Sequence, residues 1–145
     1  MQEVIGTGPR GRGQEEEISD RLGMASVLTP ARALRGHPYG NALLSRLPVK
    51  HHGGYDLTQD GFEPRLLQRV DISLQGHRVH IYNVHLGTSR RERTRQAKKL
   101  IDCLSDPAAR GPWGRFACRS LREAGRGRAG EWGGAGGQGV AYAYM

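Results

Sequence analysis

The sequence predicts an α+β fold over residues 1–106, followed by a disordered tail over residues 107–145. Two neighbouring segments alternate between apolar and polar residues, as strands with one buried face do. A third segment repeats apolar residues at helical spacing, and neither period continues beyond Pro107. These three observations divide the 145-residue chain into one small folded domain and a tail.

The alternating segments predict an antiparallel hairpin with strands over residues 66–74 and 79–85. Gln75-Gly76 lies between them and supplies the glycine that a tight turn requires. One side of the first strand carries Leu66, Gln68, Val70, Ile72 and Leu74, and one side of the second carries Val79, Ile81, Asn83 and His85.

A helix is predicted over residues 91–104, because apolar residues recur there at the spacing i, i+3, i+4 and i+7. These apolar positions are Ala97, Leu100, Ile101 and Leu104, and the opposite side carries Arg91, Arg95, Lys98 and Lys99. A second, shorter helix is predicted over residues 14–22, with Ile18 and Leu22 on its apolar side and Gly23 ending it.

Strands are also expected over residues 24–29 and 41–45, and loops over residues 30–40 and 51–61. The glycines of residues 6–13 match the pattern GxGxxG, but a dinucleotide fingerprint needs a strand before it and a helix within it. Only Met1 to Ile5 precede this segment and Pro9 interrupts it, so we interpret it as a loop that binds no nucleotide cofactor.

Composition places limits on the class of protein. The net charge of +8 favours polyanionic partners, and six arginines against two glutamates lie beyond residue 109. No apolar run reaches the roughly 18 residues of a transmembrane helix, and no signal-peptide core is found. Cys103 and Cys118 form no disulfide framework, and Cys103 is expected to be buried and reduced. An intracellular, cytoplasmic protein is therefore expected.

Four residues at or near predicted strand ends have the chemistry that phosphoester hydrolysis requires. A carboxylate such as Glu3 can hold a divalent metal, and a histidine such as His85 can transfer a proton near neutral pH. Asn41 and Arg65 supply an amide and a guanidinium, which can orient phosphate oxygens.

The motifs around these residues resemble the endonuclease/exonuclease/phosphatase superfamily of Mg²⁺-dependent phosphoesterases. The resemblance covers residues 1–106 and depends on the order of its motifs. They are Gln2-Glu3-Val4, the segment 39–48 that contains Tyr39-Gly40-Asn41, Glu63-Pro64-Arg65, Asn83-Val84-His85-Leu86-Gly87 and the helix over residues 90–104.

The resemblance implies the fold, cofactor and site of this superfamily. Its fold is a four-layer α-β-β-α sandwich, which this chain is expected to form incompletely. Glu3 would bind the metal, Mg²⁺ or alternatively Mn²⁺, and His85 would take part in acid/base and phosphate chemistry. Asn41 would be a second catalytic residue and Arg65 would bind phosphate. The substrate, a nucleic acid, phospholipid or inositol phosphate, stays open.

The sequence also departs from the superfamily pattern. The first asparagine-bearing strand, a Gly-Asp-Phe-Asn motif and a Ser-Asp-His motif are not found, and residues 111–116 have a different sequence where the second of these is expected. We therefore expect a truncated chain that is inactive or weakly active, with exposed sheet edges. The alternative is a non-catalytic protein whose basic helix and tail bind nucleic acid or acidic partners.

Overall fold

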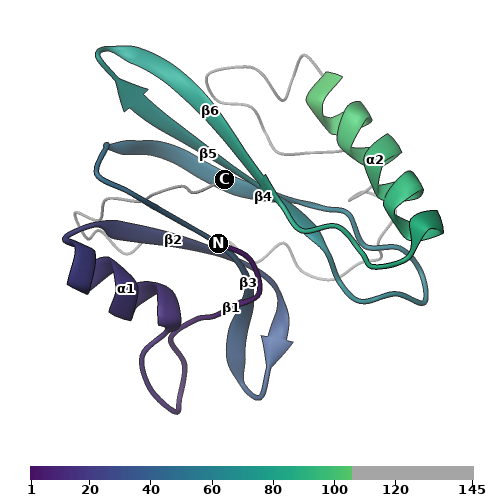
Figure 1. Ribbon diagram of the computed structural model, residues 1–145, viewed down its shortest axis with the longest axis horizontal. Coiled ribbons are helices and arrows are strands. Elements are labelled where there is room, and N and C mark those ends of the chain that lie inside the picture. Colours follow the sequence, from purple (N-terminus) through teal and green to yellow (C-terminus); the bar gives the residue numbers. More distant parts are fainter. Residues whose placement is uncertain (106–145) are drawn as a thin grey trace, which may run out of the picture.

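The computed structural model describes residues 1–105, which form six strands and two helices (Figure 1). In chain order the elements are β1 (Val4–Ile5), α1 (Gln14–Leu22), β2 (Ala25–Leu34), β3 (His37–Ser45), β4 (Val49–Asp56), β5 (Leu66–Leu74), β6 (His77–Val84) and α2 (Arg90–Ser105). The strands form two three-stranded antiparallel sheets, with the orders β1-β3-β2 and β4-β5-β6. The predicted tail over residues 107–145 and Cys118 lie outside the described residues.

The expected four-layer α-β-β-α sandwich is wrong for the described residues, which form a mostly β structure of two small sheets and two helices. The helices lie toward opposite ends of the two sheets in Figure 1. Each helix also leaves part of its apolar surface in solvent, because Ile18 of α1 is 37% exposed and Ile101 of α2 is 62% exposed. The two helices are too short to form the outer layers of such a sandwich over these sheets.

The hairpin of β5 and β6 confirms the strongest prediction from sequence. Leu74 pairs with His77 across a two-residue turn in which Gln75 and Gly76 have φ values of 49° and 84°. Positive φ at both positions is typical of the type I′ turn, whose twist matches that of the strands it joins.

The predicted loop over residues 30–40 is wrong, because β2 and β3 form a second hairpin through it. Arg35 and Gly36 have φ values of 52° and 85°, as in the β5–β6 turn. Pro30 argued against a strand here, because proline is rare inside strands. In the structure Pro30 lies at a register shift between Pro30 and Arg32, where a β-bulge tolerates proline.

The first half of the predicted loop over residues 51–61 is also wrong. These residues belong to β4, where Tyr55 pairs with Leu67 and His52 pairs with Val70. Glycine has a low strand propensity, so Gly53 and Gly54 gave no local signal for a strand. Pairing with the buried strand β5 imposes the extended conformation here.

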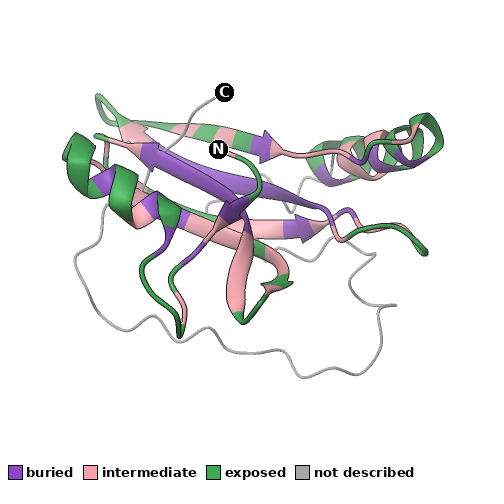
Figure 2. Ribbon diagram, turned by 60° about the horizontal axis from the view of Figure 1, so that its bottom comes forward, coloured by how far each residue is buried: buried purple, intermediate pink, exposed green. Residues whose placement is uncertain are grey.

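The core lies in two hydrophobic clusters on either side of β5. Leu43, Val70 and Ile72 pack between the sheets. Tyr55, Leu57, Leu67 and Cys103 form the second cluster, against which Leu100 of α2 packs. Figure 2 shows the buried residues concentrated in β3 and β5, the central strands of the two sheets. The prediction that Cys103 is buried is confirmed.

Both helices begin and end close to the predicted residues, but their buried sides differ from the prediction. Gly23 ends α1 in the left-handed conformation, with φ 58° and ψ 37°, as expected for a C-terminal glycine. The buried residues of α1 are Glu15 and Ser19, and those of α2 are Glu92, Gln96 and Cys103. On α2, Gln96 accepts a hydrogen bond from the loop residue Gly87 and Cys103 packs into the second hydrophobic cluster. None of the helices in residues 1–105 is both long enough and apolar enough to cross a membrane.

Candidate functional site

A small pocket brings together all four site residues predicted from the sequence. The pocket is shallow, with a cavity volume of about 10 Å³, and it opens to solvent. Glu3 precedes β1, Asn41 lies in β3, Arg65 precedes β5 and His85 follows β6. The pocket is completed by Ala31, Tyr39, Gly40, Pro64 and Leu66. Segments up to 82 positions apart in the sequence thus meet at one place.

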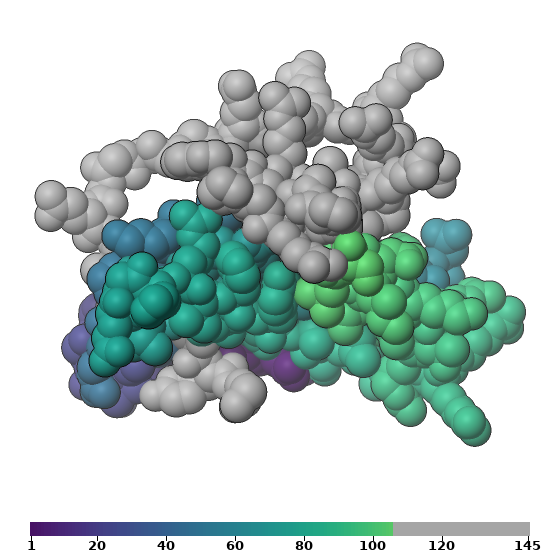
Figure 3. Space-filling model, turned by 90° about the horizontal axis from the view of Figure 1, so that it is seen from above, coloured from purple at the N-terminus to yellow at the C-terminus, as the bar shows by residue number. Residues whose placement is uncertain are grey.

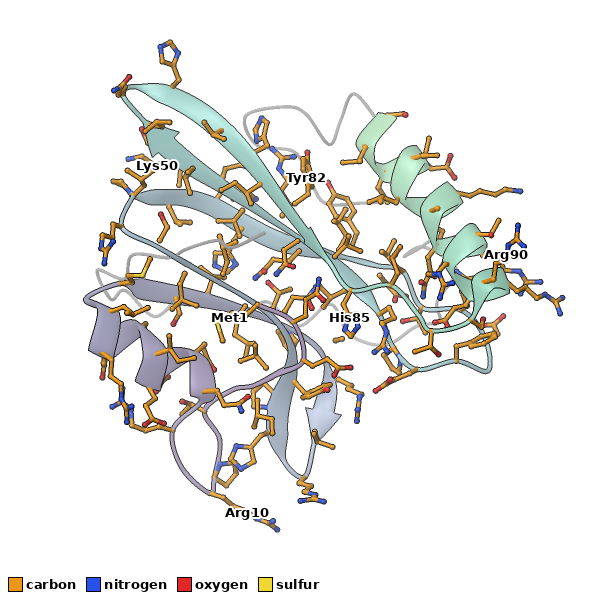
Figure 4. The ribbon with its side chains drawn as sticks, in the orientation of Figure 1. Met1, Arg10, Lys50, Tyr82, His85 and Arg90 are labelled. Atoms are coloured by element: carbon orange, nitrogen blue, oxygen red, sulfur yellow. The ribbon has the colours of Figure 1, made fainter. Side chains whose placement is uncertain are left out.

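The carboxylate of Glu3 faces two cationic or titratable side chains in this pocket. Its Oε1 lies 3.6 Å from Nδ1 of His85 and 4.0 Å from Nη2 of Arg65. The Glu3 and His85 side chains are 47% and 30% exposed, whereas that of Arg65 is 8% exposed. Figure 4 shows His85 near the middle of the molecule, where the two sheets approach each other. A ligand can therefore reach Glu3 and His85, whereas the Arg65 side chain is almost completely buried.

Hydrogen bonds to both sheets hold the segment that carries Glu3. The Met1 amino group donates to the Ala42 carbonyl at 2.8 Å, and the Ala42 N–H donates to the Met1 carbonyl at 3.1 Å. Gln2 Nε2 donates to the Val84 carbonyl at 2.7 Å. Glu3 itself has a φ of 56°, which is uncommon for a residue with a side chain. Backbone strain of this kind persists where surrounding contacts impose it, and it is frequent at functional sites.

Asn41 lies in the pocket, but its amide group serves the structure. Its Nδ2 donates to the carbonyls of Asn83 at 3.2 Å and Leu66 at 3.4 Å. These bonds join β3 of one sheet to β5 and β6 of the other. The geometry therefore favours a positioning role for Asn41 over contact with a substrate.

Two further buried amide side chains, those of Gln68 and Asn83, lie with Asn41 between the two sheets. Gln68 Nε2 donates to the Val27 carbonyl at 3.0 Å and to Thr29 Oγ1 at 2.9 Å. Asn83 Nδ2 donates to Gln68 Oε1 at 3.0 Å. Sequence reasoning assigned neither residue a role. Their signal was an amide side chain on the apolar side of a strand, which requires a hydrogen-bond partner when it is buried.

Glu63 bridges two arginines beside the pocket. Its Oε2 accepts from Nη2 of Arg65 at 2.9 Å and its Oε1 from Nη2 of Arg32 at 2.6 Å. Burial raises the pKa of the Glu63 carboxyl, but the hydrogen bonds and positive charges of the two arginines outweigh it, so the pKa lies below its ordinary value. Arg32 also lies 4.6 Å from the ring centroid of Tyr39, within cation–π range.

The loop that follows His85 is attached to α2 by a buried polar contact. The Gly87 N–H donates to Gln96 Oε1 at 2.8 Å, and Gln96 Nε2 donates to Glu92 Oε1 at 2.9 Å. A Cβ atom at Gly87 would collide with the Glu92 carboxylate, which would have to move to make room for it. The first turns of α2 therefore fix the end of the strand that presents His85.

Among the described residues, the pocket supplies one carboxylate as a candidate metal ligand. In residues 1–105, no three His, Cys, Asp or Glu side chains form a group that could bind a metal by themselves. The carboxylate of Glu3 lines the pocket. The neighbouring carboxylate of Glu63 is paired with two arginines and is not available to a metal ion. Mg²⁺ is commonly bound through one or two carboxylates together with water and substrate phosphate oxygens. Glu3 suits that mode of binding.

A second polar cluster lies within the sheet β4-β5-β6. Arg69 donates to Asp71 through Nε at 2.8 Å and through Nη2 at 2.9 Å, and His80 Nδ1 lies 2.8 Å from Asp71 Oδ1. Arg69 and Asp71 are each 1% exposed. Burial raises the pKa of Asp71, but hydrogen bonds from Arg69 and His80 outweigh it and hold the pKa below its ordinary value.

Comparison with known proteins identifies relatives without an assigned function. No protein-family model and no solved structure matches the chain. Uncharacterized protein YbhP of Escherichia coli strain K12 is 36% identical over 73 residues, which are 49% of this chain and 28% of YbhP. YbhP of Escherichia coli O6:H1 strain CFT073 and of Shigella flexneri match to the same extent. The chain therefore matches less than a third of the length of these relatives.

Proposed function

We propose that the pocket of Glu3, Arg65 and His85 is the site of a metal-dependent phosphoester hydrolase, which acts on phosphodiesters. The observation that carries this proposal is the meeting of these residues from three separate segments, with Glu3 Oε1 3.6 Å from His85 Nδ1. A carboxylate, a histidine and an arginine are the groups that phosphate binding and proton transfer require. The order of the superfamily motifs along the chain also supports the proposal.

The residues have distinct roles in this proposal. Arg65 binds a phosphate oxygen, since it lines the pocket and its Nη2 atom lies 4.0 Å from Glu3 Oε1. His85 is accessible and donates or accepts a proton at the reacting phosphate. Asn41 and Gly87 hold the elements that present these groups. Mg²⁺ or Mn²⁺ bound by Glu3 would neutralise charge on the phosphate.

His85→Ala is expected to reduce hydrolysis of a chromogenic phosphodiester by roughly 100-fold or more, the usual contribution of a general acid or base. Glu3→Gln should abolish the dependence of the rate on Mg²⁺. The full chain is assayed in millimolar Mg²⁺ and again with a chelator, because turnover is expected to be weak. His77→Ala is the matched control, since His77 lies on β6 but is exposed and distant from the pocket in the strand register.

Two results would contradict the hydrolase proposal. One is a rate that does not change in His85→Ala or Glu3→Gln, which would assign the turnover to a contaminant. The other is the absence of Mg²⁺-dependent turnover for every phosphoester tested while the chain is folded, as judged by a cooperative melt.

A second candidate function is the non-catalytic binding of nucleic acid through α2. Five of its cationic residues are exposed, namely Arg90, Arg91, Arg93, Arg95 and Lys98. Figure 3 shows the green atoms of α2 at one end of a face of the molecule. Exposed cations of this kind bind phosphate backbones without sequence preference.

The triple substitution Arg91→Gln, Arg95→Gln and Lys98→Gln is expected to weaken binding to single-stranded DNA and to reduce its salt dependence. Each lost phosphate contact should lower the slope of log K against log salt by about 0.7. Fluorescence anisotropy over a salt series measures both quantities. Glu3→Gln and His85→Ala are the controls and should bind as the wild type does. Unchanged binding in the triple variant would exclude α2 as the contact surface.

A further inference from the structure

We propose that Arg32 and Arg65 form a second phosphate subsite beside the pocket, and that the Glu63 carboxylate occupies it in the unliganded protein. This inference rests on the proposed function, since it places a further phosphate group of the substrate next to the one at Glu3 and His85. The substrate class is therefore a phosphoester that carries a neighbouring phosphate group.

The two arginines converge on one anion. Each Glu63 oxygen accepts from a different guanidinium, at 2.6 Å from Arg32 and at 2.9 Å from Arg65. Arg65 is shared with the pocket, because the same Nη2 atom lies 4.0 Å from Glu3 Oε1. An anion in the position of Glu63 is thus separated from the Glu3–His85 pair by a single guanidinium group.

Both arginines also retain an unused hydrogen-bond donor. The Nε atoms of Arg32 and Arg65 are buried and have no hydrogen-bond partner among the described residues. A buried N–H without a partner costs roughly 1–3 kcal/mol, so such groups require an explanation. A carboxylate has two oxygens, and both are already engaged by Nη2 atoms. A phosphate group has three or more oxygens and more negative charge, and it can accept from additional donors.

The surroundings favour exchange of Glu63 for a ligand. The Glu63 side chain is 40% exposed, and the segment before it contains Gly61 with a φ of 79° and the exposed Phe62. Arg32, in contrast, is held against the ring of Tyr39, and Arg65 is 7% exposed. The guanidinium groups are therefore held in place while the carboxylate between them can move into solvent.

Calorimetric titration of the full chain with inorganic phosphate tests this subsite without requiring turnover. Glu63→Gln is expected to tighten phosphate binding about tenfold, because an amide does not compete for two guanidinium groups as a carboxylate does. Arg32→Gln should weaken it by about tenfold, and Arg32→Lys should recover only part of the loss, because an ammonium lacks the planar fork. Asp60→Asn and Arg35→Gln are the matched controls, with the same charge changes at exposed positions, and should bind as the wild type does.

Weaker phosphate binding in Glu63→Gln would overturn the subsite, because Glu63 would then only organise the arginines. If Arg32→Gln and Arg35→Gln bind phosphate equally well, the subsite is also overturned, because the loss of affinity would then follow only from the change in net charge. The proposed hydrolase can fail separately. If the phosphate titrations give the expected result but no turnover is found, the hydrolase proposal fails and the subsite stands. If turnover depends on His85 but phosphate binding does not change in the Glu63 and Arg32 variants, the subsite fails and the hydrolase proposal stands.

Discussion

Arg69→Met is expected to lower the free energy of unfolding by roughly 3–5 kcal/mol, the cost of leaving a buried charge without its partner. Arg69 and Asp71 are both 1% exposed, and two hydrogen bonds of 2.8 and 2.9 Å join them. Methionine fills much of the same volume but donates no hydrogen bond, so the Asp71 carboxylate keeps only His80 in this cluster. Urea unfolding at pH 7, followed by circular dichroism, measures the loss.

The dependence of this loss on pH identifies its electrostatic origin. In the wild type the pKa of Asp71 lies below its ordinary value, so the ionised carboxylate stabilises the fold above the unfolded value of about 3.9. That contribution disappears as the pH falls through the folded pKa. Without Arg69 the buried carboxyl takes up a proton more readily, because burial favours the neutral form. The difference between wild type and Arg69→Met should therefore be smaller at pH 3 than at pH 7.

Two control variants separate the lost charge pair from other effects. The double variant Arg69→Met with Asp71→Leu removes both charges and should recover much of the stability, as replacement of a buried ion pair by apolar residues often does. Arg95→Met makes the same substitution at an exposed position of α2 and should change stability little. A single variant as stable as the wild type at pH 7 would show that the pair contributes nothing.

Gly40→Ala is expected to destabilise the protein by roughly 2–3 kcal/mol and to disrupt the pocket at the same time. Gly40 pairs with Val4 on one side and with Pro30 on the other, opposite the β-bulge. A Cβ atom here would lie 2.8 Å from the Ala31 nitrogen and still closer to the Thr29 carbonyl oxygen. Both are backbone atoms, so no change of rotamer can relieve the contact.

The same substitution should also weaken phosphate binding, because Gly40 lines the pocket between Tyr39 and Asn41. Urea unfolding and phosphate titration of one preparation measure the two effects. Ala33→Val is the control, since it adds volume to an exposed position of the same hairpin. If Gly40→Ala unfolds at the wild-type urea concentration, β2 and β3 must be able to separate without cost at the bulge.

Local patterns in the sequence determined several elements of this protein. The turn at Gln75-Gly76, the end of α1 at Gly23 and the extent of α2 depend on contacts between residues close together in the chain. Glycine at positive φ and apolar residues at regular spacing carry that information directly. For the same reason, polar groups at or near strand ends could be selected as site candidates before their positions in space were known.

Only the tertiary structure decided which of those groups meet, and how. Glu3, Arg65 and His85 share a pocket because β1, β5 and β6 are brought together by the pairing of Met1 with Ala42 and by the buried amides of Asn41 and Asn83. The strand β4 and the Arg32–Glu63–Arg65 bridge likewise depend on partners distant in sequence. Burial and long-range hydrogen bonding are properties of the assembled sheets, so no local period in the sequence could reveal them.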